Sequence, residues 1–159
     1  MAEVALFVSA TTKLKPADAV AGLIVLEDGR YLMQRRDTVP GIFYPEHWGC
    51  FGGAVNEGEA PLQALRRELR EELEFEVGAA DEFTRFDFDF GRLGQPKVFR
   101  IYYETPMSLD IFRRLVLHEG AEMRAFDGAQ LLTHEKITPY DAFAVWMHFS
   151  QRRLRVGSD

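Results

Sequence analysis

Continuous apolar residues on both sides of a tight turn predict a first β-hairpin near the start of this chain. Residues 19–26 (AVAGLIVL) form a β-branched run, and residues 30–35 resume it after the turn sequence Asp28-Gly29. Apolar segments on both sides of Asp-Gly are typical of a hairpin. We therefore expect these two segments to be neighbouring strands of a sheet.

A second hairpin is predicted by strict alternation of apolar and polar residues. Residues 82–90 (EFTRFDFDF) place three Phe on one side and two Asp on the other. A period of two is that of a strand with one packed and one solvated face. After a glycine-rich turn, residues 98–104 (VFRIYYE) are expected to return as the partner strand.

A helix is predicted after a glycine pair and a short polar loop, within residues 52–75 (GGAVNEGEAPLQALRRELREELEF). Pro61 suits the first helical position, where its missing N–H is not needed. Leucines recur at spacings of three and four residues and therefore form one buried stripe. These leucines are Leu62, Leu65, Leu69 and Leu73.

Three glutamates of this helix, Glu68, Glu71 and Glu72, lie on a different face. Like charges four residues apart destabilise an isolated helix. Clustered carboxylates beside a glycine turn offer the oxygen ligands that Mg²⁺ prefers. The plainer interpretation is a solvated acidic surface, which is common on amphipathic helices. The charge pattern alone leaves both interpretations open.

The remaining strands are predicted to be short. Residues 48–51 lead as a strand into the glycine pair, and residues 115–117 and 123–126 are each expected to be a short strand. Residues 127–132 are predicted to form a turn or a short helix.

The last predicted helix begins at Thr138, a residue type that caps helix N-termini, and Pro139 suits its first turn. Asp141 has the spacing from Thr138 of a capping box. We expect the core-facing side chains of this helix to be Tyr140, Phe143, Ala144 and Met147.

Composition restricts the class of protein. Of 159 residues 47% are hydrophobic and 13 are Phe, which indicates one globular domain with a proper core. The net charge of −6 argues against a nucleic acid polymer as the main partner, but not against a small nucleotide. Cys50 is the single cysteine, which excludes an internal disulfide and a Cys-rich metal site.

The N-terminal segment and the apolar runs bear on localisation. No apolar run is long enough to span a bilayer. The apolar patch near the N-terminus has no basic region ahead of it, so we interpret residues 1–17 as a leading strand or an N-terminal extension, not a signal peptide. The sequence therefore predicts a cytoplasmic protein without a membrane partner.

The fixed positions in residues 53–75 resemble the Nudix box, GX5EX7REUXEEXGU, in which U is a bulky aliphatic residue. A match of this length is a specific signal. Glu74 departs from the pattern, because the family's second Gly usually stands there and ends the helix. We therefore expect the helix to run longer or to stop at Gly78. The matching positions are Gly53, Glu59, Arg67, Glu68, Leu69, Glu71 and Glu72, and Phe75 fills the last bulky position.

The resemblance implies a fold and a reaction. The fold is α/β (α+β), a mixed β-sheet sandwiched between α-helices, here as a single domain over residues 1–159. The reaction is Mg²⁺-dependent hydrolysis of a phosphoanhydride bond in a nucleoside diphosphate linked to another group, with Mn²⁺ as a substitute metal. Such metals neutralise phosphoryl oxygens and lower the pKa of a bound water.

The resemblance leaves the substrate and the assembly open. A nucleotide sugar such as ADP-ribose, a (d)NTP and a dinucleoside polyphosphate are all compatible with the box, and members of the family often form homodimers. The alternative is a non-catalytic Nudix-fold module that binds a nucleotide or regulates a partner. Such modules tend to lose box carboxylates, and all of them are present here.

The resemblance also implies roles for single residues. Glu68 and Glu72, on one helix face, are the expected metal ligands, together with the backbone carbonyl of Gly52. Glu71 is expected to join them through a second metal or a water. A glycine at position 52 lets the backbone approach closely.

One further carboxylate is expected from a loop later in the chain. Glu119, which precedes a glycine and the last strand, is the expected general base or additional metal ligand, and Glu122 and then Glu104 are the alternatives. Arg67 points elsewhere on the helix, where it would hold Glu59 or Glu119 in place.

Substrate contacts are predicted in the loop at residues 37–47 and at its borders. Arg36 closes a strand, either as plain surface or in contact with a phosphate. The apolar side chains of this loop either pack onto the body of the protein or offer an aromatic face to a base. The residues expected to contact the substrate are Arg36, Phe43, Tyr44 and Trp48.

Overall fold

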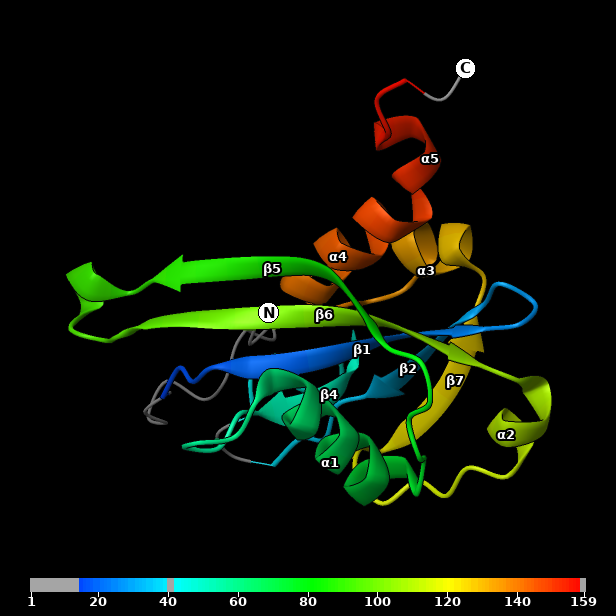
Figure 1. Cartoon of the computed structure of the whole chain (residues 1–159), viewed down its shortest axis with the longest axis horizontal. Helices are drawn as coiled ribbons and strands as arrows, with labels where there is room; N and C mark the ends of the chain where they lie inside the picture. The colour runs from blue at the N-terminus through cyan, green and yellow to red at the C-terminus, as the bar shows by residue number, and fades with distance from the viewer. Residues whose placement is uncertain (1–14, 40–41, 158–159) are drawn as a thin grey trace, which may run out of the picture.

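The computed structural model describes residues 15–39 and 42–157 (Figure 1). The prediction for residues 1–14 lies outside these ranges, and residues 15–18 form no strand. The strands are β1 (Ala19–Leu26), β2 (Tyr31–Arg35), β3 (Trp48–Gly49), β4 (Phe51–Ala54), β5 (Asp81–Asp89), β6 (Lys97–Met107) and β7 (Glu122–Phe126). The helices are α1 (Pro61–Leu73), α2 (Leu109–Arg113), α3 (Gly128–His134), α4 (Pro139–Phe149) and α5 (Gln151–Leu154).

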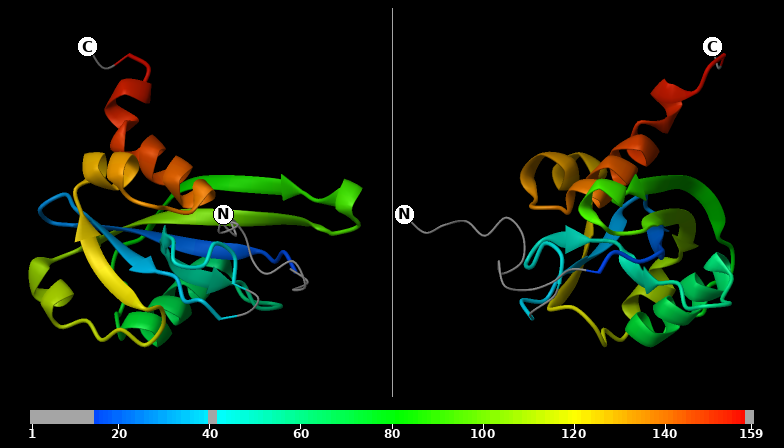
Figure 2. Two further views of the ribbon diagram at one scale, coloured as in Figure 1. Left: turned by 180° about the vertical axis from the view of Figure 1, so that it is seen from behind. Right: turned by 90° about the vertical axis from the view of Figure 1, so that its left-hand side faces the viewer.

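The seven strands of the described residues form one mixed sheet, as expected from the sequence. The order is β3-β2-β1-β6-β5, with β4 beside β1 and β7 beside β2. β1 and β6 run parallel, whereas their other pairings in the sheet are antiparallel. Helix α1 lies on one side of the sheet and α3 and α4 on the other (Figures 1 and 2).

Each face of the sheet has its own hydrophobic core, which explains the sandwich. On one face the leucine stripe of α1 packs with Val20, Ile24 and Ile101. On the other face Leu131 of α3 and Val145 of α4 pack with residues of β1, β2 and β6. Alternate residues of β1 supply both cores, because successive side chains of a strand point to opposite faces.

Both predicted hairpins are present. β1 and β2 pair through Val25 and Tyr31 around the Asp28-Gly29 turn. β5 pairs with β6 over its whole length, and its phenylalanines are half-buried while its three aspartates are exposed. β6 extends to Met107, three residues beyond the predicted end, because its entire C-terminal half pairs in parallel with β1.

The end of α1 differs from the prediction. The helix neither runs longer nor continues to Gly78, but ends at Leu73. Glu74 takes the left-handed conformation at φ 54°, and its N–H bonds the carbonyl of Arg70. Glu74 thus adopts the conformation for which glycine is favoured at this position.

Glu74→Gly should therefore stabilise the protein. The left-handed conformation costs a non-glycine residue about 1–2 kcal/mol, and glycine avoids this cost. Part of the gain is lost again, because glycine makes the unfolded chain more flexible. We expect a net gain of about 0.5–1 kcal/mol in the free energy of unfolding, measured by urea denaturation. The ion pair between Glu74 and His118 is half-exposed, so its loss matters little. Glu76→Gly, at a position without positive φ, is the control and should give no gain.

Residues 115–117 do not form the predicted strand. The N–H groups of Val116 and His118 donate instead to the carbonyls of Leu73 (3.3 Å) and Glu72 (2.8 Å). These carbonyls belong to the last turn of α1 and have no partner within the helix. Helix α2 was not predicted from the sequence, although Ser108 caps it by accepting a hydrogen bond from the N–H of Ile111.

The orientation of α4 was predicted only in part. Thr138 is its N-cap residue but makes no side-chain cap, and Ala144 is fully buried as expected. Phe143, predicted to face the core, is 53% exposed, and Tyr140 and Met147 are only partly buried. The core face instead carries Asp141 and His148, whose buried polar atoms are satisfied by hydrogen bonds. No helix in the described ranges has the length and apolar character needed to cross a membrane.

Candidate active site

A cavity of about 670 Å³ lies where α1, the sheet and the loop after β2 meet. Glu72, Glu119 and Gly52 line one part of it, called here the carboxylate end. Phe88 and Val98, paired across β5 and β6, line the part farther along the sheet, called here the aromatic end.

Glu72 is the most buried carboxylate of the Nudix box. It is only 2% exposed, and its Oε2 accepts a hydrogen bond from the N–H of Gly52 at 3.0 Å. Burial, followed by the charges of Glu119 and Glu68, raises its pKa from 4.5 to about 9. The pKa of Glu68 is also raised, first by burial, with contributions from Glu71 and Glu119. The site therefore holds carboxylates that repel one another.

The glycine pair makes this close arrangement sterically feasible. Gly52 has φ +146°, and a Cβ there would collide with the backbone carbonyl of Val20 on β1. A Cβ on Gly53 would lie 2.6 Å from the carboxylate oxygens of Glu68. Position 52 thus needs glycine for packing against β1, and a side chain at position 53 would displace the carboxylate of Glu68 on α1.

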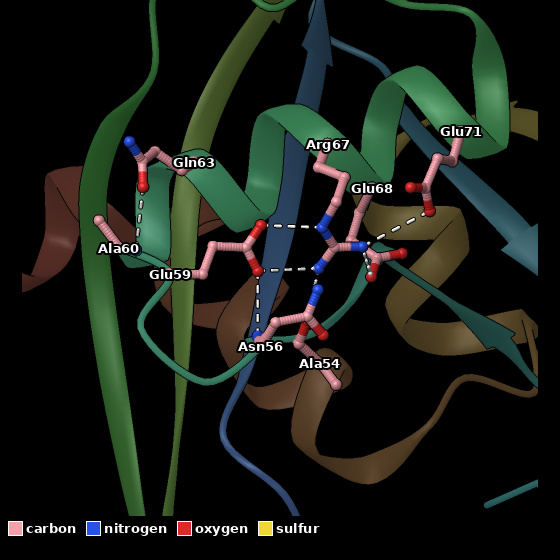
Figure 3. A network of polar contacts seen from close by, with 8 residues as sticks. All are labelled: Ala54, Asn56, Glu59, Ala60, Gln63, Arg67, Glu68 and Glu71. Carbon is pink, nitrogen blue, oxygen red and sulfur yellow. Dashed lines mark hydrogen bonds and ion pairs between the residues drawn. The ribbon is translucent and has the colours of Figure 1, made fainter.

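Arg67 organises the other side of the box (Figure 3). Its Nε and Nη2 donate to the two oxygens of Glu59 at 2.8 and 3.0 Å, and Nη2 also donates to the carbonyl of Ala54. Its Nη1 donates to Glu68 at 2.7 Å. Of the two carboxylates that the sequence offered to Arg67, the structure pairs it with Glu59. The hydrogen bonds with Glu59 and then Glu68 raise the pKa of Arg67.

Glu71 is the exposed member of the box. Its carboxylate approaches Arg67 at 3.5 Å and its side chain is 60% exposed. Its side chain, like that of Glu68, extends from α1 toward Arg67 (Figure 3). It is therefore accessible from solvent, unlike Glu72.

The oxygen donors fit a hard divalent cation. In the ranges that the structure describes, no group of three His, Cys, Asp or Glu side chains is already arranged as a metal site. The charge of Glu119 nevertheless raises the pKa values of both Glu68 and Glu72, and that of Glu68 raises the pKa of Glu72 further. A divalent cation among them would relieve this repulsion, and carboxylate oxygens are suitable Mg²⁺ ligands.

The alternatives to Glu119 lie outside the cavity lining. Glu122 pairs with Arg124 at 2.6 Å and with Arg35 at 3.5 Å. Glu104 lies 2.8 Å from Nε2 of His148. Glu119 lines the cavity beside Gly120. Of the three loop or strand carboxylates considered from the sequence, only Glu119 faces the carboxylate end.

Three of the four predicted substrate contacts line the cavity. Arg36 does so with its Nε bonded to the carbonyl of Phe43 at 2.6 Å, and Phe43 and Tyr44 line it as well. Trp48 does not line it: it is 6% exposed and packs edge-to-face on Phe126. We therefore leave Trp48 out of the proposed substrate contacts.

Sequence reasoning missed a group of polar residues in the cavity and beneath it. Arg100 lines the cavity, bonded to Tyr102 and Asp141, and Tyr140 lines it beside them. The available signal was a single arginine within the apolar strand sequence VFRIYYE. A cation in such a strand needs a partner, which here comes from α4, far away in the sequence.

Comparison with known proteins decides the family. The family model described as NUDIX domain matches residues 15–147. The chain belongs to the Nudix family. The matched residues include 53–75, the segment that carries the Nudix box.

Individual relatives agree with this placement. The nucleoside triphosphatase NudI of Escherichia coli is 44% identical over 50 residues, which is 31% of this chain and 35% of that protein. The matched part thus spans about a third of the length of this curated relative. A MutT protein from Methanosarcina mazei is 21% identical with a TM-score of 0.69, covering 92% of this chain and 100% of its own.

A further solved structure has the same fold. The dihydroneopterin triphosphate pyrophosphohydrolase of E. coli is 21% identical with a TM-score of 0.66, covering 87% of this chain and 98% of its own. At these identities the likeness of the solved structures shows the Nudix fold alone. Family membership supports hydrolysis of a diphosphate bond in a nucleoside diphosphate derivative.

Proposed function

We propose that this Nudix hydrolase converts a nucleoside triphosphate and water into a nucleoside monophosphate and pyrophosphate, with Mg²⁺ as cofactor. The observation that supports this proposal is that one cavity joins the box carboxylate Glu72, together with Glu119, to an aromatic end. Phosphates held by metal at the carboxylate end would leave the base among aromatic side chains. The triphosphatase named among the relatives supports this substrate class.

One set of residues would bind the metal, and a second set positions the metal ligands. Glu68, Glu72, Glu119 and the Gly52 carbonyl would hold Mg²⁺, which when bound neutralises phosphate charge and activates water. Arg67 keeps the Glu68 carboxylate in place through its 2.7 Å bond, while Glu59 and the Ala54 carbonyl fix Arg67 itself. Fixed groups of this kind need no rearrangement as charge develops.

Proton transfer and phosphate binding fall to two further residues. Glu119 accepts a proton from the attacking water. At the same time the water oxygen forms its bond to phosphorus and the phosphoanhydride bond breaks. Arg36, which lines the cavity and whose charge acts on Glu72, offers its guanidinium to phosphate oxygens. Glu71, being exposed, would bind a second cation or a metal-bound water.

The test is product analysis with protein freed of metal by a chelator. With added Mg²⁺ or Mn²⁺, each of the common nucleoside triphosphates would be incubated, and a nucleotide sugar and a dinucleoside polyphosphate would be tested in parallel. Monophosphate plus pyrophosphate from a triphosphate, dependent on metal, is the expected result. Cleavage confined to the nucleotide sugar or the dinucleotide would overturn the substrate proposal.

The role of Glu119 has a matched control in this chain. Glu119→Gln should lower kcat by about 100-fold or more, the usual contribution of a general base. Glu122→Gln removes a carboxylate three residues away that pairs with arginines outside the cavity, and it should leave kcat unchanged. Equal effects of the two changes would exclude Glu119 as the base.

A further inference from the structure

Arg100 is a charged side chain built into the lining of the cavity. Its side chain is 16% exposed, and that of its partner Asp141 is 0% exposed. Burial disfavours the charged guanidinium, yet the carboxylate of Asp141 holds the pKa of Arg100 above its ordinary value. A fixed positive charge therefore lies beside the space open to a substrate.

The guanidinium is held on several sides. Its Nε donates to the hydroxyl of Tyr102 at 2.9 Å and its Nη2 to Asp141 at 3.1 Å. It lies over the ring of Tyr140 at 4.9 Å and that of Tyr102 at 5.3 Å. No hydrogen bond among the described residues uses Nη1, although Arg100 lines the cavity. Donors of Nη1 are thus available to a ligand.

The register of the sheet gives the distance between Arg100 and the carboxylate end. Gly52 and Tyr102 both pair with Ala21, and Arg100 lies two residues before Tyr102. With strands about 4.8 Å apart and a rise of about 3.3 Å per residue, the Cα atoms of Gly52 and Arg100 are roughly 12 Å apart. A nucleotide whose phosphates lie at the carboxylate end can therefore place its base near Arg100.

We propose that Arg100 selects the base of the substrate by donating a hydrogen bond to an exocyclic carbonyl oxygen. Arginine has donors and no acceptor, so it pairs with the O6 of guanine or hypoxanthine and the O4 of uracil or thymine. Adenine and cytosine carry an amino donor at that position and leave both groups unpaired. This inference rests on the proposed function and names the substrate class within it: triphosphates of keto bases.

The first test uses the unaltered protein and two matched substrate pairs. ITP differs from ATP, and UTP from CTP, in having a keto oxygen and a ring N–H in place of an amino group and a bare ring nitrogen. We expect kcat/KM to be about tenfold or more higher for the keto member of each pair, which is the usual discrimination of such contacts. Equal values within each pair would overturn the assignment.

The second test assigns the preference to Arg100. Because a single change leaves a buried charge, Arg100→Gln is combined with Asp141→Asn, which keeps polar groups of similar size. The amide of glutamine both donates and accepts, so the ITP to ATP ratio should fall toward one, mainly through KM. An unchanged ratio in a folded variant would overturn the proposal.

A matched control comes from the neighbouring strand. Arg85 also pairs with an aspartate, Asp87 at 2.9 Å, and also lies over an aromatic ring, that of Phe99 at 4.4 Å. Arg85 is not part of the cavity lining. Arg85→Gln with Asp87→Asn should therefore leave the ITP to ATP ratio as it is in the unaltered protein.

The outcomes separate this inference from the proposed function. Hydrolysis of triphosphates without base preference would leave the function standing and refute the role of Arg100. If no triphosphate is hydrolysed, the proposed function fails, and calorimetry with IMP and AMP then tests Arg100 alone. Tighter binding of IMP that the paired variant abolishes supports the role, and equal binding refutes it.

Discussion

Glu72→Gln is expected to abolish hydrolysis and, at the same time, to stabilise the metal-free protein. Loss of a metal-binding carboxylate removes several kcal/mol of transition-state stabilisation, which corresponds to a decrease of about 1,000-fold in kcat. The amide oxygen can still accept the hydrogen bond from Gly52, so the fold keeps this contact. The variant therefore loses only the free-energy cost of burying the charged carboxylate of Glu72.

The sign of the stability change follows from the raised pKa of Glu72. Between pH 4.5 and about 9 the folded protein holds a proton that the unfolded chain has released. The free energy of unfolding therefore falls as pH rises through this window, and glutamine removes that fall. At pH 8, which is 3.5 pH units above 4.5, we expect a gain of at most about 5 kcal/mol in the free energy of unfolding and a higher Tm, and this gain vanishes near pH 4.5.

The measurements are turnover with Mg²⁺ and thermal unfolding with and without it. Mg²⁺ should raise the Tm of the unaltered protein by binding the folded state, and should do so much less in the variant. Glu76→Gln changes an exposed carboxylate outside the box and serves as the control for both readouts. Near-normal turnover of Glu72→Gln would refute the assigned role, and a lower Tm at pH 8 would refute the buried-charge argument.

Asp141→Ala is expected to destabilise the protein more than any surface change. Asp141 accepts hydrogen bonds from the Cys50 N–H at 3.0 Å, the Tyr102 hydroxyl at 2.7 Å and Arg100 at 3.1 Å. Its removal leaves a buried guanidinium without a counter-charge, which costs about 3–5 kcal/mol. Urea denaturation measures this loss as a lower midpoint with an unchanged slope.

A double-mutant cycle separates the ion pair from packing. Arg100→Leu combined with Asp141→Ala removes both charges and should recover much of the stability lost in Asp141→Ala. Asp87→Ala, which breaks the exposed pair with Arg85, should have no measurable effect. A loss below about 1 kcal/mol in Asp141→Ala would contradict the importance of the buried pair.

Local patterns in the sequence predicted most of the fold. The leucine spacing located α1 because a helix that packs on a sheet needs one apolar face. The Asp28-Gly29 turn and the alternating phenylalanines located both hairpins for similarly local reasons. The box spacing predicted which glutamates share a face of α1, and the structure pairs Arg67 with one of the two expected carboxylates.

The predictions that were wrong depended on partners distant in the sequence. Residues 115–117 have strand-like composition, but their N–H groups bond the free carbonyls of α1. Asp141 has capping-box spacing, yet a buried arginine 41 positions away takes its carboxylate. On α4 the buried position is therefore Asp141, whereas Phe143 is 53% exposed. Local propensity contains no information on such tertiary partners.

The buried pair of Arg100 and Asp141 also bears on how such an enzyme evolves. Each residue is tolerated inside the protein because the other is present, so a change at either position alone is strongly counter-selected. A lineage that alters base preference at position 100 must therefore change position 141 at nearly the same time. Close homologues are expected to keep both residues or to have replaced both, and substrate preference should change in discrete steps along the family tree.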